Sequence, residues 1–247
     1  MLKNIFNTYS AKYKYQSLVL FSHLTFFAYC YIFGLSYFIF AIIIGWIVSN
    51  LAHYLYIHRI YTHKHFHISE MKHNIFMLLF TLLNLGSPAV YAATHVMHHA
   101  NSGKKGDPHD PYQLGFVRTF LSLWDKNFTP DRKLLARFLK DKITKKYHAN
   151  HFSIATFSAI FTPFLVVMGF YLSKISIIFV HIPFLGYRTE KDQDTSTNAW
   201  YLKPITWGEE LHNNHHINSG SANHNFQKSL KEIDLLYFIG KIIADKK

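Results

Sequence analysis

Cysteine is almost absent from this 247-residue sequence, which contains only Cys30. A single thiol forms neither an internal disulfide framework nor a cysteine-based zinc site. Because Cys30 lies inside an apolar run, we expect it to be buried and chemically inert. A metal site in the chain would therefore have to take most of its ligands from other residue types.

Acidic residues are also few, since 14 aspartates and glutamates stand against 26 lysines and arginines, for a net charge of +12. No nucleic-acid recognition motif accompanies this charge, so we expect no nucleic-acid partner. An anionic membrane leaflet is the simpler explanation, and docking of an acidic electron donor or a phosphate-bearing substrate is the other. The sequence also lacks a GxSxG elbow and a Walker loop, so it offers no hydrolytic or phosphate-binding motif.

Charged residues make up only 16% of the chain and are excluded from two long apolar stretches. The first stretch, residues 18–52, breaks at Gly34, and the second, residues 152–187, has its expected turn at Gly169–Lys174. A transmembrane helix needs about 20 residues, so each stretch is long enough for a hairpin of two short helices. We predict an all-α integral membrane fold with four transmembrane helices in two hairpins, at approximate spans 17–33, 35–54, 152–169 and 172–187.

The distribution of basic residues predicts the orientation. Only Lys174 falls on the far side of the predicted spans, so the positive-inside rule places both termini in the cytoplasm, together with a cap formed by residues 55–150 and 188–247. The apolar segment Ile75–Leu85 is too short to cross and is expected to be a re-entrant, interfacial or buried helix. Residues 1–247 then form a single multi-pass domain without a cleavable signal, in a bacterial inner membrane or the endoplasmic reticulum.

Three histidine clusters lie at the ends of these spans, all on the predicted cytoplasmic side. On a helix, positions i, i+3 and i+4 project from one face, so each HxxHH cluster is expected to offer three imidazoles to a single site. The first cluster is a pair of histidines five residues apart, a spacing that directs the two side chains toward the same centre less closely. The sequences are His58-Arg-Ile-Tyr-Thr-His63, His95-Val-Met-His98-His99 and His212-Asn-Asn-His215-His216.

Eight imidazoles exceed the four ligands of a zinc ion and suit two six-coordinate transition metals that keep a position open. A nitrogen-rich site of this kind favours iron, and a pair of irons can reduce dioxygen and attack an unactivated C–H bond. The sequence therefore predicts two Fe ions, with no catalytic side chains beyond the metal ligands.

With these motifs in order, the chain resembles the membrane-bound fatty-acid desaturases of the stearoyl-CoA desaturase type between Gly45 and Leu235. The resemblance implies four transmembrane helices beneath a cytosolic cap, two irons, and a narrow tunnel for an acyl chain. No fused cytochrome b5 segment is visible, so we expect a separate ferredoxin, or cytochrome b5 with its reductase, to supply electrons. The matching segments are the three boxes, Phe66, Gly86-Ser87-Pro88, Gly106-Asp107-Pro108-His109-Asp110-Pro111, Gly115-Phe116, Gly186-Tyr187-Arg188, Asn198-Ala199-Trp200, Gly208-Glu209-Glu210 and Glu232-Ile233-Asp234.

The sequence departs from this family at the ninth histidine, which normally lies just before Gly-Tyr-Arg. Pro183 stands at that position, and His181 lies two residues upstream. His181 is thus either a ninth metal ligand or a polar residue of the span. The family's asparagine, four residues before its histidine, has no counterpart, because Ile177 and Phe179 occupy the candidate positions.

Other polar residues beside the boxes are candidates to hold the outer nitrogens of the imidazoles. Hydrogen bonds to these nitrogens orient metal-binding histidines, and the candidates are Asp107, His109, Glu209 and Asn214. The remaining histidines complete no spacing pattern and are expected to be exposed or interfacial, namely His53, His65, His67, His73, His148, His151 and His224.

These features predict an O2-dependent desaturase that introduces a cis double bond into a fatty acyl chain, with an acyl thioester as the expected substrate. A hydroxylase, ketolase or related histidine-box oxygenase on the same scaffold is one alternative, although Asp-Pro-His and Gly-Tyr-Arg favour the desaturase. The other is a non-enzymatic membrane metal-binding protein. Transport would need polar ligands through the membrane depth, where only His23 and His181 are candidates.

Overall fold

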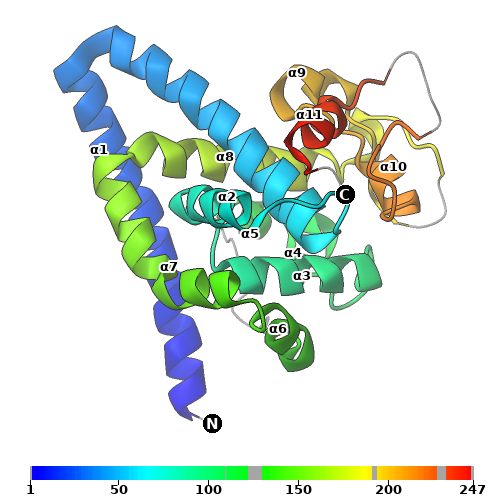
Figure 1. Ribbon diagram of the computed structural model, residues 1–247, viewed down its shortest axis with the longest axis horizontal. Coiled ribbons are helices and arrows are strands. Elements are labelled where there is room, and N and C mark those ends of the chain that lie inside the picture. The colour runs from blue at the N-terminus through cyan, green and yellow to red at the C-terminus, as the bar shows by residue number, and fades with distance from the viewer. Residues whose placement is uncertain (1, 109, 122–129, 191–193, 227–231, 246–247) are drawn as a thin grey trace.

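The computed structural model describes residues 2–108, 110–121, 130–190, 194–226 and 232–245, and helices form its architecture (Figure 1). No strand occurs in these ranges, and two isolated bridges pair Asn198 with Tyr187 and with Leu211. The all-α prediction is therefore confirmed for this part of the chain. In order, the helices are α1 (Leu2–Ser49), the π-helix η1 (Asn50–Thr62), α2 (Glu70–Leu82), α3 (Pro88–Asn101), α4 (Pro111–Leu114), α5 (Phe116–Leu121), α6 (Arg132–Phe138), α7 (Lys142–Phe161), α8 (Pro163–Phe179), the 3-10 helices η2 (Pro183–Leu185) and η3 (Trp200–Leu202), α9 (Lys203–Thr206), α10 (His212–Ile217) and α11 (Leu235–Ile243).

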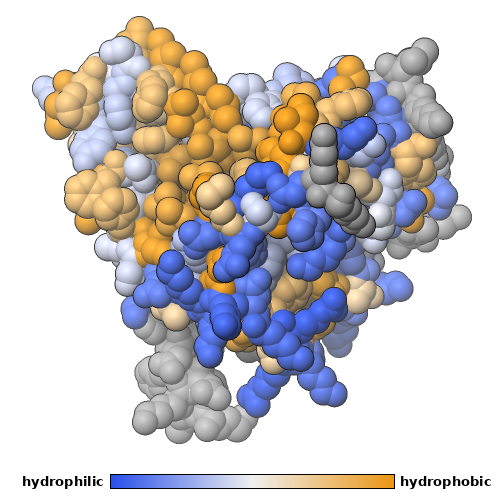
Figure 2. Space-filling model, in the orientation of Figure 1, coloured by the Kyte–Doolittle hydropathy of each residue, from blue (hydrophilic) through white to orange (hydrophobic). Residues whose placement is uncertain are grey.

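The first apolar stretch doubles back at Gly34, as predicted. Gly34 has φ 74° and ψ −165°, a non-helical conformation inside α1, and Figure 1 shows the two halves of α1 meeting there in a sharp bend. Large apolar side chains around the bend, including Tyr31, Ile32 and Leu35, are more than half exposed. Figure 2 shows apolar surface over this region and hydrophilic surface toward the end of the molecule that holds α3 and α6.

By length and composition, the described part of the chain has one helical stretch that could cross a membrane, Lys14–Thr62, or up to two if the bent pair α7–α8 counts as one span. The four crossings remain a prediction.

The second apolar stretch differs from the prediction. Its helices α7 and α8 meet at an angle of 110° next to Thr162, and α8 continues through Gly169–Lys174 without a turn. The expected turn there is therefore wrong, and the helix boundaries do not match spans 152–169 and 172–187. Gly169 instead permits close packing, because a Cβ atom there would lie 3.0 Å from the Leu83 side chain.

Lys174 is accordingly a buried residue of a helix and not part of a far-side loop. Its side chain is 1% exposed overall, and its ammonium donates a hydrogen bond of 2.8 Å to the carbonyl of Thr119. Lys174 was the one basic residue predicted to face the opposite compartment. Its hydrogen bond to Thr119 instead joins α8 to α5 inside the protein.

The second half of α1 runs directly into η1, and this continuous rod carries the first histidine box. Trp46 and Asn50 both donate to the carbonyl of Ile205, at 2.8 and 3.0 Å, which fixes the segment before the third box against the rod. The amide of Leu236 donates to the carbonyl of Trp207 at 2.8 Å and seats α11 beside the same segment. Helix α2 forms over most of the expected Ile75–Leu85 segment and packs against η1 and α7.

The Gly34 bend predicts a sharp difference between two glycine substitutions. Its φ and ψ lie in a region open essentially to glycine alone, so Gly34→Ala should destabilise the protein by about 1–3 kcal/mol through backbone strain. No other atom lies within 4 Å of the added methyl group, so crowding contributes nothing. Thermal unfolding in detergent should show a lower midpoint for Gly34→Ala and an unchanged one for Gly220→Ala, where the added carbon meets only Asn218 Oδ1 at 3.6 Å. Equal midpoints for the two variants would contradict this assignment.

Candidate metal centre

The first histidine pair owes its alignment to the π-helix η1, whose hydrogen bonds join residues five apart. The amide of His63, which follows η1, donates to the carbonyl of His58 at 3.1 Å, and the two imidazole centroids lie 4.9 Å apart. In an α-helix the same spacing would rotate the second ring by about 140°. The π-winding therefore brings together two side chains that α-helical geometry would separate.

The eight box histidines form two groups, each with ligand atoms within 4.8 Å of one another. We call them the five-histidine group and the three-histidine group. The five-histidine group is His58, His63, His95, His99 and His215, and the three-histidine group is His98, His212 and His216.

Helices α3 and α10 each divide their histidines between the two groups. In α3, His95 and His99 belong to the five-histidine group and His98 to the three-histidine group. In α10, only His215 belongs to the five-histidine group, and the other two histidines belong to the three-histidine group. Consecutive residues on a helix differ in direction by about 100°, so an HH pair points to two places. The expectation that each HxxHH cluster serves a single site is wrong.

The Nε2 atoms of the five-histidine group lie too close to be satisfied by hydrogen bonds alone. Four contacts of 2.9–3.0 Å link the five atoms in a chain, in the order His58, His215, His99, His95, His63. A neutral Nε2 has one in-plane position, either a proton or a lone pair, so at most two of the four contacts are hydrogen bonds. A cation would instead accept all five lone pairs. With metal–imidazole bonds of about 2.1 Å, adjacent ligands of an octahedral ion lie about 3.0 Å apart, which fits these separations.

The three-histidine group shows a comparable need for a cation. The Nε2 atoms of His98 and His216 are 3.2 Å apart, and both ring nitrogens of His212 are buried without a hydrogen-bond partner. His181 lies beside this group, with its ring centroid 5.0 Å from that of His212 and 5.5 Å from that of His98. The two-residue shift in the sequence therefore does not carry His181 away from the group, and its role as ninth ligand stays a prediction.

Two of the predicted outer partners contact box histidines. Asp107 Oδ1 lies 2.7 Å from Nδ1 of His98, and Glu209 Oε1 lies 2.7 Å from Nδ1 of His58. A carboxylate at the outer nitrogen fixes the proton there and leaves Nε2 free to bind a metal. Burial, the main cause, raises the pKa of Glu209 to about 8, so without a bound metal this carboxyl is mostly protonated at neutral pH, and a nearby cation would favour its carboxylate form.

A third carboxylate, Asp194, was not predicted from the sequence. It forms an ion pair with Nδ1 of His216 and also accepts a hydrogen bond of 2.6 Å from Ser102. Asp194 lies 18 residues before the third box with no spacing motif, so no sequence signal marks it. Three histidines thus have a carboxylate at the outer nitrogen, one in the five-histidine group and two in the other.

The other predicted outer partners differ. Asn214 contacts no box imidazole, and its amide bonds instead to Asn198, Thr189, Glu232 and the backbone of His224, which holds the loops around α10 together. His109 lies outside the described residues.

Burial keeps most of these imidazoles in the form that binds metals. Desolvation is the largest cause of the lowered pKa in six of them, and repulsion between neighbouring imidazoles adds to it; the pKa of His63 falls to about 3. The six are His58, His63, His95, His99, His212 and His215. Their lone pairs are available at neutral pH without loss of a proton.

A cavity of about 60 Å³ adjoins the three-histidine group. His98, His181 and His212 line one side, and Ser173, Ser176 and Ile177 line another. Ile177, at a position where the related sequences were expected to place an asparagine, gives this wall an apolar side chain. A small open space therefore lies directly against candidate metal ligands.

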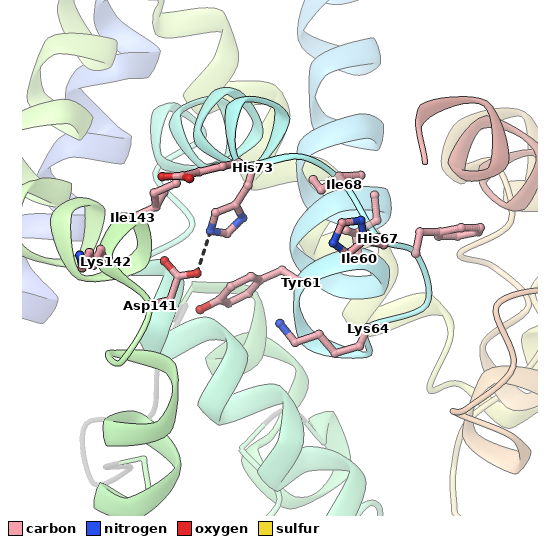
Figure 3. A pocket seen from close by; sticks show the side chains of 11 residues that line it. Ile60, Tyr61, Lys64, His67, Ile68, His73, Asp141, Lys142 and Ile143 are labelled. Atoms are coloured by element: carbon pink, nitrogen blue, oxygen red, sulfur yellow. Dashed lines mark ion pairs between the residues drawn. The ribbon is translucent and has the colours of Figure 1, made fainter. Parts of the chain in front are cut away.

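A larger pocket of about 470 Å³ lies on another part of the surface and contains no box histidine (Figure 3). Lys64, Lys142 and Glu70 are among its lining residues, and His73 there makes an ion pair of 3.1 Å with Asp141. Its mixed charge points to no single ligand.

Two other histidines expected to be exposed or interfacial are buried. His53 is 5% exposed and His224 only 1%. The ring centroids of His224 and His215 lie 4.5 Å apart, so His224 lies against the five-histidine group.

These lowered pKa values predict that the metal-free protein is sensitive to acid. The unfolded chain protonates its histidines near the ordinary pKa of 6.5, whereas folded His63 does so only near 3. Protons therefore favour the unfolded state, and the free energy of unfolding should fall as the pH drops from about 6.5 toward 3. Thermal melting of metal-free protein at a series of pH values tests this, with His67→Ala as a control that retains the same dependence. A midpoint that stays constant over this range would contradict the burial of neutral imidazoles.

Comparison with known proteins finds relatives of one kind, although no protein-family model matches the chain. The chain is 28% identical over 218 residues to an sn-1 stearoyl-lipid 9-desaturase of Anabaena variabilis. This alignment covers 82% of this chain and 79% of the relative. It is also 28% identical to the protein of the same name from Synechocystis sp., over 76% of this chain and 62% of the relative. A Delta-9 acyl-lipid desaturase 1 of Arabidopsis thaliana is 25% identical, over 81% of this chain and 70% of the relative.

These similarities extend well beyond the histidine boxes, since each alignment covers at least three quarters of the chain. The resemblance predicted from the motifs is confirmed: over most of its length this chain is similar to proteins named delta-9 desaturases, which are oxidoreductases.

Proposed function

We propose that this protein is an O2-dependent di-iron desaturase that introduces a cis double bond into a fatty acyl chain. The observation that carries the proposal is the convergence of eight histidines, five of them buried and three half-buried, into two groups, in a chain related to delta-9 desaturases. The five-histidine group would hold one iron, and the three-histidine group with His181 would hold the other. Iron bound there would supply the reduction of dioxygen and the cleavage of unactivated C–H bonds.

The protein itself contributes position and exclusion of water. His98 and His212 border the cavity of about 60 Å³, so a methylene group inside it would lie against the proposed ligands. The apolar side chain of Ile177 faces the same space. Asp107 and Glu209 hold the outer nitrogens of their histidines, which directs Nε2 inward.

We propose an acyl thioester as the substrate. The names of the relatives include lipid-linked desaturases and one acyl-CoA C20 Delta5-desaturase, from Anemone leveillei, so both kinds of acyl substrate occur among them. A separate ferredoxin, or cytochrome b5 with reductase, would donate the electrons. The basic residues Arg132, Arg137 and Lys142 are exposed and could meet an acidic donor or an anionic leaflet.

The proposed location is a multi-pass position in the membrane, with the histidine groups and both termini on the cytoplasmic side. The apolar surface around the Gly34 bend and the helices α7 and α8 support this placement. The histidines lie away from the bend, on the end of the molecule that continues from η1.

A hydroxylase would use the same histidines, so the product decides between the two oxidations. Desaturation is favoured because the relatives named above are all desaturases.

Fatty-acid profiling of desaturase-deficient cells that express the chain should reveal a new unsaturated acid. His212→Ala and His215→Ala, one from each group, should each lower its yield at least about 100-fold, because each removes a proposed ligand. His67→Ala is the matched control, since His67 is exposed and belongs to neither group, and it should leave the yield unchanged.

Gas chromatography with mass spectrometry measures the product, and parallel feeding of acyl lipids and acyl-CoA to membranes identifies the carrier. A hydroxylated product would transfer the assignment to the oxygenase alternative. Full yield from both ligand variants would exclude the proposed centre.

A further inference from the structure

A fully buried arginine lies directly behind the five-histidine group. Arg59 follows the first box histidine on η1 and has no exposed surface. Its Nη1 donates to both carboxylate oxygens of Asp234, each at 2.8 Å, and Asp234 is itself 1% exposed. A buried guanidinium is costly without such a partner, because its hydration is lost.

The guanidinium also lies close to two side chains that each contact a different box histidine. Its Nε lies 3.6 Å from Glu209 Oε2, and the other oxygen of Glu209 lies 2.7 Å from Nδ1 of His58. Its Nη2 lies 2.9 Å from Nδ1 of His224, whose ring packs against that of His215 with a centroid separation of 4.5 Å and a tilt of 30°. One planar cation therefore contacts the supports of a histidine from the first box and of a histidine from the third.

We infer that Arg59, held by Asp234, is a positioning residue that sets the geometry and metal affinity of the five-histidine group. The inference rests on the proposed metal centre. A guanidinium presents its donors in a rigid fork, so the positions of His224 and Asp234 are fixed relative to one another, and the same cation attracts the Glu209 carboxyl at 3.6 Å. The three partners belong to the segments around α10 and α11, whereas Arg59 belongs to η1, so this cation sets how boxes one and three meet.

The contact with His224 also defines that residue's proton. Arginine only donates, so Nδ1 of His224 accepts and its proton lies on Nε2. A histidine in this tautomer has no lone pair to offer at Nε2. Arg59 thus keeps His224 as a packing partner of His215 and out of the ligand set, although the two rings touch.

Asp234 links this arrangement to the C-terminal helix. Its carboxylate accepts from the amide of Tyr237 at the start of α11 and from the amide of His224. Gly208, with φ +119°, allows the approach, because a Cβ atom there would overlap the Asp234 carboxylate. The glycine of the Gly-Glu-Glu motif therefore has a physical role in the same network.

Titration of the metal-free, full-length protein with Co²⁺ in detergent tests the inference. Wild type should bind two equivalents, and Asp234→Asn should weaken one of them about 10-fold, the lower end of the effect of losing a group bonded to a ligand, because Asp234 acts through Arg59. The matched control is Asp245→Asn, which removes the Lys72–Asp245 ion pair just beyond α11 without touching a histidine support. It should bind both equivalents as wild type does, and the same two affinities in Asp234→Asn would overturn the inference.

A second variant separates positioning from folding. The double variant Arg59→Met with Asp234→Asn removes both charges of the buried ion pair, so no uncompensated charge is left, while the asparagine oxygen can still accept from the backbone amide of Tyr237 or His224. Our inference predicts a melting midpoint near that of wild type with one equivalent of Co²⁺ still weakened and its visible spectrum altered. Two unperturbed equivalents would show that the pair only supports the fold. Failure of wild type itself to bind two equivalents would instead refute the proposed metal centre.

Discussion

The constraint on which this structure depends is the crowding of imidazole nitrogens in a buried space. Five Nε2 atoms lie in a chain of contacts of 2.9–3.0 Å, and neutral imidazoles cannot satisfy that chain by hydrogen bonding. Protonation would worsen the crowding through repulsion between like charges, which burial already opposes. A metal cation would relieve it, and the proposed metal binding would then be coupled to folding in this part of the chain.

The surrounding helices are arranged to sustain this crowding. The π-winding of η1 aligns the first histidine pair, while α3 and α10 distribute their histidines in opposite ways between the two groups. Carboxylates at the outer nitrogens of His58, His98 and His216 then fix the direction of each ring. Behind them, the Arg59–Asp234 pair joins the first rod to the C-terminal helix. The carboxylates therefore constrain the orientation of the histidine rings, and the Arg59–Asp234 pair constrains the groups behind those rings.

Much of this could be predicted from local patterns. Spacing identified the eight box histidines, apolar runs identified the all-α fold, and Gly34 interrupted an apolar run where the backbone needs a glycine. Asp107 and Glu209 could be predicted as partners of the box histidines because they lie near the boxes in the sequence. Such features depend on residues that lie close together along the chain or that form a repeating pattern.

Features that depend on tertiary packing were not predictable. The composition of Gly169–Lys174 suggested a turn, but packing of Gly169 on Leu83 and the bond from Lys174 to Thr119 keep α8 continuous. Asp194 reaches His216 from a loop with no motif.

The division of each HxxHH cluster between two groups also depends on how α3 and α10 face each other, which spacing within one helix leaves undetermined. His224 was assigned to the surface for the same reason, since nothing in its neighbourhood along the chain marks its contact with His215.

The most direct test of the central claim is X-ray absorption spectroscopy at the iron edge of purified, iron-loaded protein. The account predicts two irons per chain and a nearest shell dominated by imidazole nitrogen, at about 2.1 Å. A single iron per chain, or a nearest shell made mainly of oxygen or sulfur, would contradict the assignment of the two histidine groups as one two-metal centre.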